Sequence, residues 1–266
     1  MGIINTNELL RFTRVNKKLT QEEVAFGICS VGTLSRYENG DLMPSKCKFD
    51  ALMNRMGVSP SKYQILLSER EYTLHKKISQ IKSLFMKYDY EQALLEINSL
   101  HKDIGNAEPL LLQYYLSMKT ILEFELYGII ASTKKCLLSA LQITLDLNNL
   151  SKTCLTQHES LILYYLSKIH RLEQKPQKSL PYLRILYETF TIQYMDNTIY
   201  ELQLFFRIAY DLINCLVETN QYQEAILYCN LILKKYQNIL NIENYKCISN
   251  YKKHILHLLN SCHVSE

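Results

Sequence analysis

The sequence predicts an all-α protein in which a small N-terminal domain of five helices precedes an α-solenoid of helical hairpins. The first observation behind this prediction is that glycine is scarce, because the 266 residues include only 7 glycines, whereas average usage would give about 19. The second is that five of these glycines lie in the first 57 residues, and only Gly105 and Gly128 follow. The third is a weak internal repeat later in the chain. A long stretch with so little glycine is typical of stacked helices.

The composition is that of a globular protein. Hydrophobic residues make up 47% of the chain and charged residues 21%. Charges such as Lys119 and Glu123 interrupt the apolar runs well before the ~18 residues that a membrane span requires. The N-terminus has neither the basic flank nor the apolar core of a signal peptide. We therefore expect a cytoplasmic protein without a transmembrane segment.

The potentially reactive residues form no recognisable catalytic or metal-binding motif. The eight cysteines lie 14 or more residues apart, which argues against zinc or dithiol chemistry and favours small, reduced core residues. His254 and His257 could face one metal ion, but no third ligand accompanies them. The sequence also has no Gly-rich phosphate loop, His-Glu-x-x-His or Gly-x-Ser-x-Gly motif. We therefore expect a protein that is not an enzyme and uses no cofactor.

The formal net charge of +4 is concentrated at the start of the chain. The first 66 residues contain 9 basic and 6 acidic residues, which leaves 21 of the 30 basic and 20 of the 26 acidic residues for the remainder. A mild local excess of positive charge is typical of a small nucleic-acid-binding module beside a neutral domain.

Local signals place the helices of the first region. Thr20-Gln-Glu-Glu23 is a capping box, so a helix of about nine residues should begin there. Ser30 can cap the next helix, which Gly40 should end in the left-handed conformation. Pro44-Ser45 opens a further helix. The five expected helices are residues 7–16, the helix of about nine residues that begins at 20, and residues 30–40, 45–57 and 60–67.

The remaining chain reads as longer helices separated by short breaks, with a weak repeat. The repeated unit is a tetrad of residues. Each tetrad should open the second helix of a hairpin and end in a small or apolar residue, which lets helices approach. A fixed period of this length indicates a solenoid, because one hairpin cannot cover its own apolar face. The expected domains are therefore residues 1–67 and 68–266. The tetrads, at intervals of 43, 44 and 45 residues, are Tyr90–Ala93, Thr133–Cys136, Gln177–Leu180 and Tyr222–Ala225.

The segment 19–40 reads Leu-Thr-Gln-Glu-Glu-Val-Ala-Phe-Gly-Ile-Cys-Ser-Val-Gly-Thr-Leu-Ser-Arg-Tyr-Glu-Asn-Gly and resembles the helix-turn-helix of the Cro/repressor (XRE) class. Its turn is one residue shorter than usual, which is similar to the RRNPP regulators, particularly the Rgg-like and PlcR-like members. Those proteins join this domain to a tetratricopeptide-like solenoid, so the resemblance covers nearly the whole chain. It implies a transcriptional regulator in quorum sensing that binds DNA and is controlled by a short signalling peptide.

The second helix of the motif, expected over residues 30–40, is the recognition helix. A step of about 100° per residue turns Leu34 and Tyr37 inward, with Glu38 beside them. The opposite face, Gly32, Ser35, Arg36 and Asn39, can then enter a major groove. Arg36 can form paired hydrogen bonds with guanine, and Val31 could meet a thymine methyl. A solvated surface charge is the alternative interpretation of Arg36.

The resemblance also implies contacts that position the domain. In this class, amide donors and helix N-termini favour a phosphate, and the positions that contact phosphate correspond to Gln21 and Ser30 at two helix starts, and to Asn39 and Lys46. Arg14 and Glu38 occupy places that form an internal ion pair in many members, so we assign them a structural role.

Polar residues recur on the first helices of three predicted hairpins. In the family resembled, such helices line a groove that holds the peptide, and Asn214 and Arg207 best fit the roles of clamping its backbone and meeting its carboxylate. An ordinary solvated face is the alternative for each residue. The expected peptide-binding residues are Gln113, Ser117, Tyr164, Lys168, Arg207, Tyr210 and Asn214, and Thr120, Ser160, Arg171 and Gln203 extend the stripes.

The expected partners are double-stranded DNA with an inverted-repeat operator, a signalling peptide and a second copy of the chain, since two half-sites require two reading heads. Two alternatives remain open from the sequence. One is a mobile-element repressor whose solenoid serves dimerisation or binds a partner protein, without a peptide ligand. The other is an interaction scaffold whose helix-turn-helix no longer binds DNA.

Overall fold

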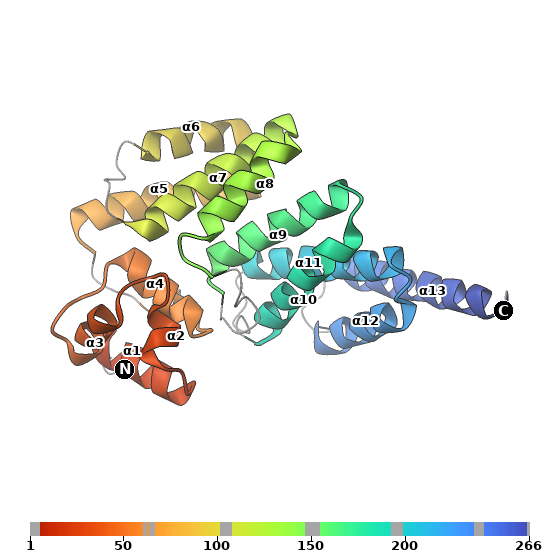
Figure 1. The fold of residues 1–266 in the computed structure, drawn as a ribbon, viewed down its shortest axis with the longest axis horizontal. Coiled ribbons are helices and arrows are strands. Elements are labelled where there is room, and N and C mark those ends of the chain that lie inside the picture. The colour runs from red at the N-terminus through yellow and green to blue at the C-terminus, as the bar shows by residue number, and fades with distance from the viewer. Residues whose placement is uncertain are drawn as a thin grey trace. The chain divides into compact units, whose positions relative to one another are not determined.

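The computed structural model describes residues 6–60, 63, 67–101, 108–146, 155–192, 199–236 and 242–264, and every regular element within them is a helix (Figure 1). The all-α prediction is confirmed. The chain divides into two compact units, Met1–Tyr165 with Ile192–Asp196 and Leu166–Thr191 with Asn197–Glu266. None of the described helices is long and apolar enough to cross a membrane.

The first region contains four described helices: α1 (Thr6–Asn16), α2 (Gln21–Ala25), α3 (Val31–Asn39) and α4 (Lys46–Arg55). The capping box at Thr20 is present, but α2 has five residues and is shorter than expected because Gly27 turns the chain at φ +70°. The fifth helix expected over residues 60–67 lies mostly outside the described residues. One core holds the four helices together, and its fully buried side chains include Leu10, Val24, Leu34, Phe49 and Leu52.

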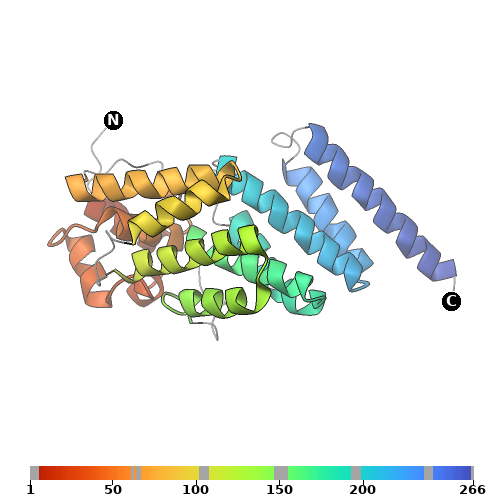
Figure 2. The same cartoon turned by 90° about the horizontal axis from the view of Figure 1, so that it is seen from above.

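The rest of the chain is a series of helical hairpins followed by a final helix. In Figure 2, α5 and α6 lie side by side, as do α7 and α8, and in the second unit α12 lies against both α11 and α13. The helices are α5 (Glu69–Met86), α6 (Tyr90–Leu100), α7 (Pro109–Tyr127), α8 (Ile130–Leu141), α9 (Gln157–Leu172), α10 (Pro176–Ile192), α11 (Ile199–Glu218), α12 (Tyr222–Tyr236) and α13 (Ile242–Val264).

The same turn joins the two helices of every hairpin. A residue with positive φ stands two positions before each of α6, α8, α10 and α12. Only one of these residues is glycine, which explains how the solenoid can be so poor in glycine although each turn uses the left-handed conformation. The four residues are Tyr88 (φ 62°), Gly128 (φ 69°), Gln174 (φ 58°) and Asn220 (φ 59°).

These turns correct the register of the predicted repeat. The second helix of the α7–α8 hairpin starts at Ile130 and that of the α9–α10 hairpin at Pro176, so the tetrads Thr133–Cys136 and Gln177–Leu180 are out of register. Cys136 is exposed and cannot let helices approach. The small side chains that do so, four positions into the turn-aligned tetrads, are Ala93, Thr133, Ser179 and Ala225, and each is at most 4% exposed.

The cysteines are less uniformly buried than expected. Cys215 and Cys229 are core residues, but Cys136 and Cys247 are exposed, and Cys29 and Cys47 are half-buried. The residues Cys154 and Cys262 lie where side chains are not described. Burial raises the pKa of Cys47 to about 12, so this thiol stays protonated and is a poor nucleophile.

Candidate nucleic-acid interface

Helix α3 presents a polar outer face to solvent and an apolar inner face to the core. Leu34, Tyr37 and Glu38 are buried, as the periodicity predicts. The N-cap Ser30 accepts a hydrogen bond from the Thr33 amide at 3.1 Å, and Gly40 ends the helix at φ 83°. Of the expected reading residues, Val31, Gly32, Arg36 and Asn39 are exposed and Ser35 is half-buried.

Glu38 ties α3 to the two preceding helices. Its carboxylate accepts hydrogen bonds from Arg14 Nε at 2.6 Å and Arg14 Nη2 at 2.8 Å, and from Gln21 Nε2 at 2.8 Å. Burial alone would raise the pKa of Glu38, but the bonds from Arg14 and Gln21 bring the pKa below its usual value. A bidentate, charge-assisted contact fixes orientation as well as distance, so this carboxylate sets the angle at which α3 is presented.

Gln21 has a partner within the protein. Its side-chain Nε2 donates one hydrogen bond to Glu38 at 2.8 Å, and because an amide nitrogen carries two N–H donors, the second stays available to a phosphate. The capping box of Thr20 and Glu23 already uses part of the hydrogen-bonding capacity at the start of α2. Only the remaining backbone amides there can bind an anion.

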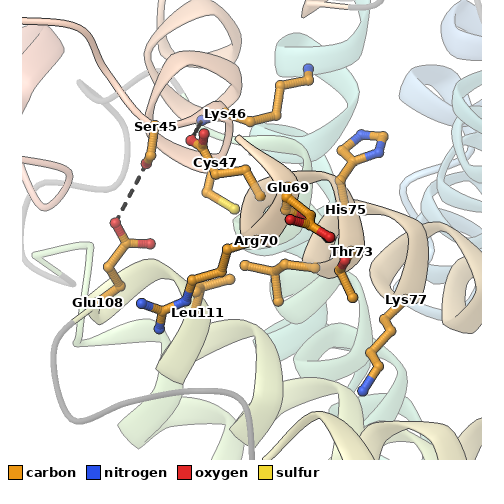
Figure 3. Close-up of a pocket in the computed structure, with 12 residues that line it drawn as sticks. Ser45, Lys46, Cys47, Glu69, Arg70, Thr73, His75, Lys77, Glu108 and Leu111 are labelled. Atoms are coloured by element: carbon orange, nitrogen blue, oxygen red, sulfur yellow. Dashed lines mark hydrogen bonds between the residues drawn. The ribbon is translucent and has the colours of Figure 1, made fainter. Parts of the chain in front are cut away.

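The start of α4 is surrounded by carboxylates (Figure 3). The Lys46 backbone amide donates to Glu71 Oε1 at 3.1 Å, and Ser45 Oγ donates to Glu108 Oε1 at 3.4 Å. The Lys46 ammonium pairs with Asp50 one turn later. Lys46, expected to hold a DNA phosphate, is thus engaged within the protein at both its amide and its side chain.

Three residues expected to bind the peptide are buried, and this corrects the interpretation of their stripes as exposed faces. Gln113 is 2% exposed and donates to Ala140 O at 3.1 Å and to Thr144 Oγ1. Ser117 is fully buried and donates to Gln113 O at 2.6 Å. Tyr164 is 8% exposed. These side chains are covered inside the protein, so they do not line an open groove.

Three residues that extend the stripes also have partners within the protein. Ser160 is fully buried and donates to Thr156 O, and Thr120 donates to Leu116 O. Arg171 pairs with Asp211 and Glu218 of α11. Such pairs hold neighbouring hairpins together across the repeat.

In the second unit, α11 keeps a polar face near solvent. Arg207 and Tyr210 are exposed and Asn214 is half-buried, and Lys168 of α9 is half-buried. The Tyr210 ring lies 5.7 Å from that of Tyr251 on α13. A mixture of basic, amide and aromatic groups at one helical spacing suits adaptable recognition.

Sequence reasoning missed a buried ion pair that joins helix α4 of the helix-turn-helix domain to helix α9 of the repeat region. Arg55, at the end of α4, and Glu159, in the first turn of α9, are both fully buried, and Arg55 Nη2 lies 2.8 Å from Glu159 Oε1. Glu159 also accepts from the Thr156 amide at 2.7 Å, and the Glu159 amide donates to Thr156 Oγ1. The Thr-x-x-Glu pattern of a capping box is visible in the sequence. The ion pair is not visible, because Arg55 lies 104 residues before Glu159.

The same buried region contains a neutral histidine. Burial, with the positive charge of Lys82, lowers the pKa of His158 to about 4, and its Nε2 contacts Ser117 Oγ. Ser117 Oγ also donates to Gln113 O at 2.6 Å, so the histidine, the serine and the backbone of α7 form one contact network.

Residues 10–63 match the family described as helix-turn-helix. No curated protein sequence matches the chain. The solved structure of Bacillus thuringiensis PlcR in complex with the peptide PapR7 and DNA is 16% identical, with a TM-score of 0.53 over 96% of this chain and 88% of that chain.

A second structure, ComR from S. thermophilus in complex with DNA and its signalling peptide, is 14% identical over 96% of this chain and 94% of that chain, with a TM-score of 0.28. The likeness to PlcR is one of fold. The N-terminal region is thus a helix-turn-helix domain of the XRE type, carried by a chain with the helical-repeat fold seen in PlcR.

Proposed function

We propose that the chain is a cytoplasmic, non-enzymatic transcriptional regulator that reads an inverted-repeat operator as a homodimer and is controlled by a short signalling peptide. The observation that carries the proposal is the outer face of α3, where Val31, Gly32, Arg36 and Asn39 are exposed on a helix whose inner face is locked into the helix-turn-helix core. A helix fixed in this way can present side chains to base edges in a major groove.

The division of labour follows the two regions. Residues 1–67 would read DNA, and residues 68–266 would bind the peptide and form the dimer. Ser35 would share the reading face, and Ser30 and Asn39 would contact backbone phosphates beside it. The dimer is proposed because half-sites about one helical turn apart need two linked reading heads.

The peptide site is proposed in the second unit. Arg207, Tyr210 and Asn214 lie on one face of α11, and Lys168 lies on α9. The guanidinium and the ammonium suit a carboxylate, and the Asn214 amide can pair with a peptide backbone. That PlcR was crystallised with a peptide as well as DNA supports a peptide ligand for this fold. Gln113, Ser117 and Tyr164 are left out because they are buried.

The peptide proposal is tested by calorimetry with synthetic peptides from short reading frames adjacent to the gene. Replacing Asn214 with alanine should weaken binding by about tenfold, because two backbone hydrogen bonds are lost. Asn230→Ala, on an exposed position of α12, is the matched control and should bind like the wild type. Equal binding by both variants would remove Asn214 from the site, and binding of no peptide would favour a repressor without a peptide ligand.

A further inference from the structure

Helix α1 of the helix-turn-helix domain has one face in the core and the opposite face exposed. Leu9, Leu10 and Thr13 are buried. The exposed positions are three or four residues apart, so they form one stripe along the helix. Within this stripe Phe12 is 66% exposed and Val15 is 55% exposed, which brings two large apolar side chains together at the surface. The α1 stripe consists of Glu8, Arg11, Phe12, Val15 and Asn16.

A groove runs beside the α1 stripe. Its volume is about 520 Å³, and its lining extends from Glu8, in the first turn of α1, past Phe12 to Lys17, just after the last turn. Val58 and Tyr63, which follow α4 in the chain, also line it. The two charged ends are nine positions apart in the sequence, or about 2.5 turns of α-helix. The groove therefore has the length that another helix of two or three turns would fill.

The charges at the ends of the groove restrict which helix fits it. Glu8 and Lys17 are both exposed and carry opposite charges. A helix lying along the groove therefore needs a basic residue beside Glu8, an acidic residue beside Lys17 and apolar side chains between them. Helix α1 of a second copy meets these requirements when a two-fold axis relates the two helices, because Glu8 of each copy then faces Lys17 of the other.

We propose that the α1 stripes of two copies pair, antiparallel, as the contact between the two helix-turn-helix domains of the homodimer. Phe12 lies near the middle of the stripe, so the ring of each copy meets the groove of the other, and Glu8–Lys17 pairs form at both ends. One pair of short helices buries less than the roughly 1,200 Å² of a stable interface. The contact therefore acts between domains that the repeat helices already hold at a high effective concentration. This inference rests on the proposed homodimer.

Pairing of the α1 stripes would also fix the distance between the two recognition helices. Arg14 of α1 holds Glu38 of α3 through two hydrogen bonds, at 2.6 Å and 2.8 Å, so the position of α3 follows that of α1. The contact thus determines which spacing of operator half-sites the dimer accepts, whereas the outer face of α3 determines which bases it prefers.

The test uses charge reversal in the full chain. Glu8→Lys and Lys17→Glu are each combined with Arg11→Cys, which places a thiol beside the proposed two-fold axis. A short bismaleimide then links the two copies. Mass spectrometry of the digested protein measures the yield of the link between the two positions 11, separately from any link through a native cysteine. The matched control is Glu69→Lys with the same Arg11→Cys change, because Glu69 is also an exposed glutamate in the first turn of a helix.

Each single reversal puts like charges at both ends of the paired helices, so its yield should be about tenfold lower than that of the control. Co-expression of the two reversal variants should restore about half of the yield or more, because the mixed dimer again has opposite charges at both ends. Co-expression cannot repair a defect within one chain, so this recovery identifies a contact between copies.

Two results would overturn the α1 contact and leave the proposed dimeric regulator intact. One is an equal yield for the control and both reversal variants, and the other is the absence of a link at position 11 in a protein that sediments as a dimer. Sedimentation of the wild type as a monomer, both with and without DNA of the gene's upstream region, would contradict the contact and the proposed homodimer together.

Discussion

Replacing Arg55 with methionine is expected to lower the free energy of unfolding by about 3–5 kcal/mol, because it leaves the Glu159 carboxylate buried without its charge partner. Both side chains are fully buried and lie 2.8 Å apart. Thr144 Oγ1 and the Thr156 amide also donate to this carboxylate, but neutral donors do not neutralise a charge. Urea unfolding followed by circular dichroism measures the loss.

The control for this prediction removes the second charge as well. In Arg55→Met/Glu159→Gln no buried charge is left at this pair, and glutamine can still accept from Thr156 as part of the capping box. The double variant should therefore be more stable than Arg55→Met alone. Arg70→Met, at an exposed position of α5, should unfold like the wild type. If Arg55→Met and Arg70→Met unfold at the same urea concentration, the buried pair does not have the role assigned to it.

Replacing Gly27 with alanine is expected to cost about 4 kcal/mol or more, or to prevent folding. Gly27 has φ +70°, and a Cβ atom there would lie 1.9 Å from the backbone oxygen of Thr144. That oxygen cannot rotate away as a side chain could, so the turn of the helix-turn-helix and residue 144 would have to separate. Thermal and urea unfolding of the purified variant measure the loss.

Gly128→Ala is the matched control for Gly27. Gly128 has nearly the same backbone conformation, φ +69°, but a Cβ atom there would meet no heavy atom of the described residues within 4 Å. Its substitution should cost only the strain of a left-handed residue, about 1–2 kcal/mol. Equal losses for the two alanine variants would show that the close approach to Thr144 carries no energetic weight.

The local part of the fold could be predicted because its signals are short-range. Thr20 and Glu23, Ser30 and Gly40 mark helix ends through contacts within one turn, and the spacing of Leu34 and Tyr37 fixes which face of α3 is buried. The all-α class followed from composition, since only Gly105 and Gly128 follow position 57.

The repeat register could not be predicted from residue identity. Gly128 and Asn220 mark two of the four hairpin turns, because glycine and asparagine adopt the left-handed conformation most readily. Tyr88 and Gln174 adopt the same conformation without being residue types that predict it. An alignment of the tetrads by chemical similarity alone matches Cys136 to Ala93. In the structure, Thr133 occupies the buried place equivalent to Ala93.

Burial of polar groups depends on partners that are distant in sequence. Gln113 and Ser117 look like parts of an exposed polar face, yet Gln113 donates to Thr144, 31 residues away, and Ser117 contacts His158, 41 residues away. A polar residue is buried when such partners satisfy it. Helical periodicity shows only which residues share a face and does not show what covers that face.

The claim that α3 reads DNA is tested most directly by selecting bound sequences from a random duplex pool with the wild type and with Arg36→Ala. The wild type should enrich an inverted repeat whose half-sites are about one helical turn apart. Arg36→Ala should lose the preference for guanine at one position of each half-site, with a loss of about 1–3 kcal/mol for the wild-type sequence. Arg36→Lys keeps the charge without the paired hydrogen bonds and should bind DNA with the same loss of base preference. Enrichment of the same sequence by the wild type and by Arg36→Ala would contradict the assignment of α3 as the reading helix.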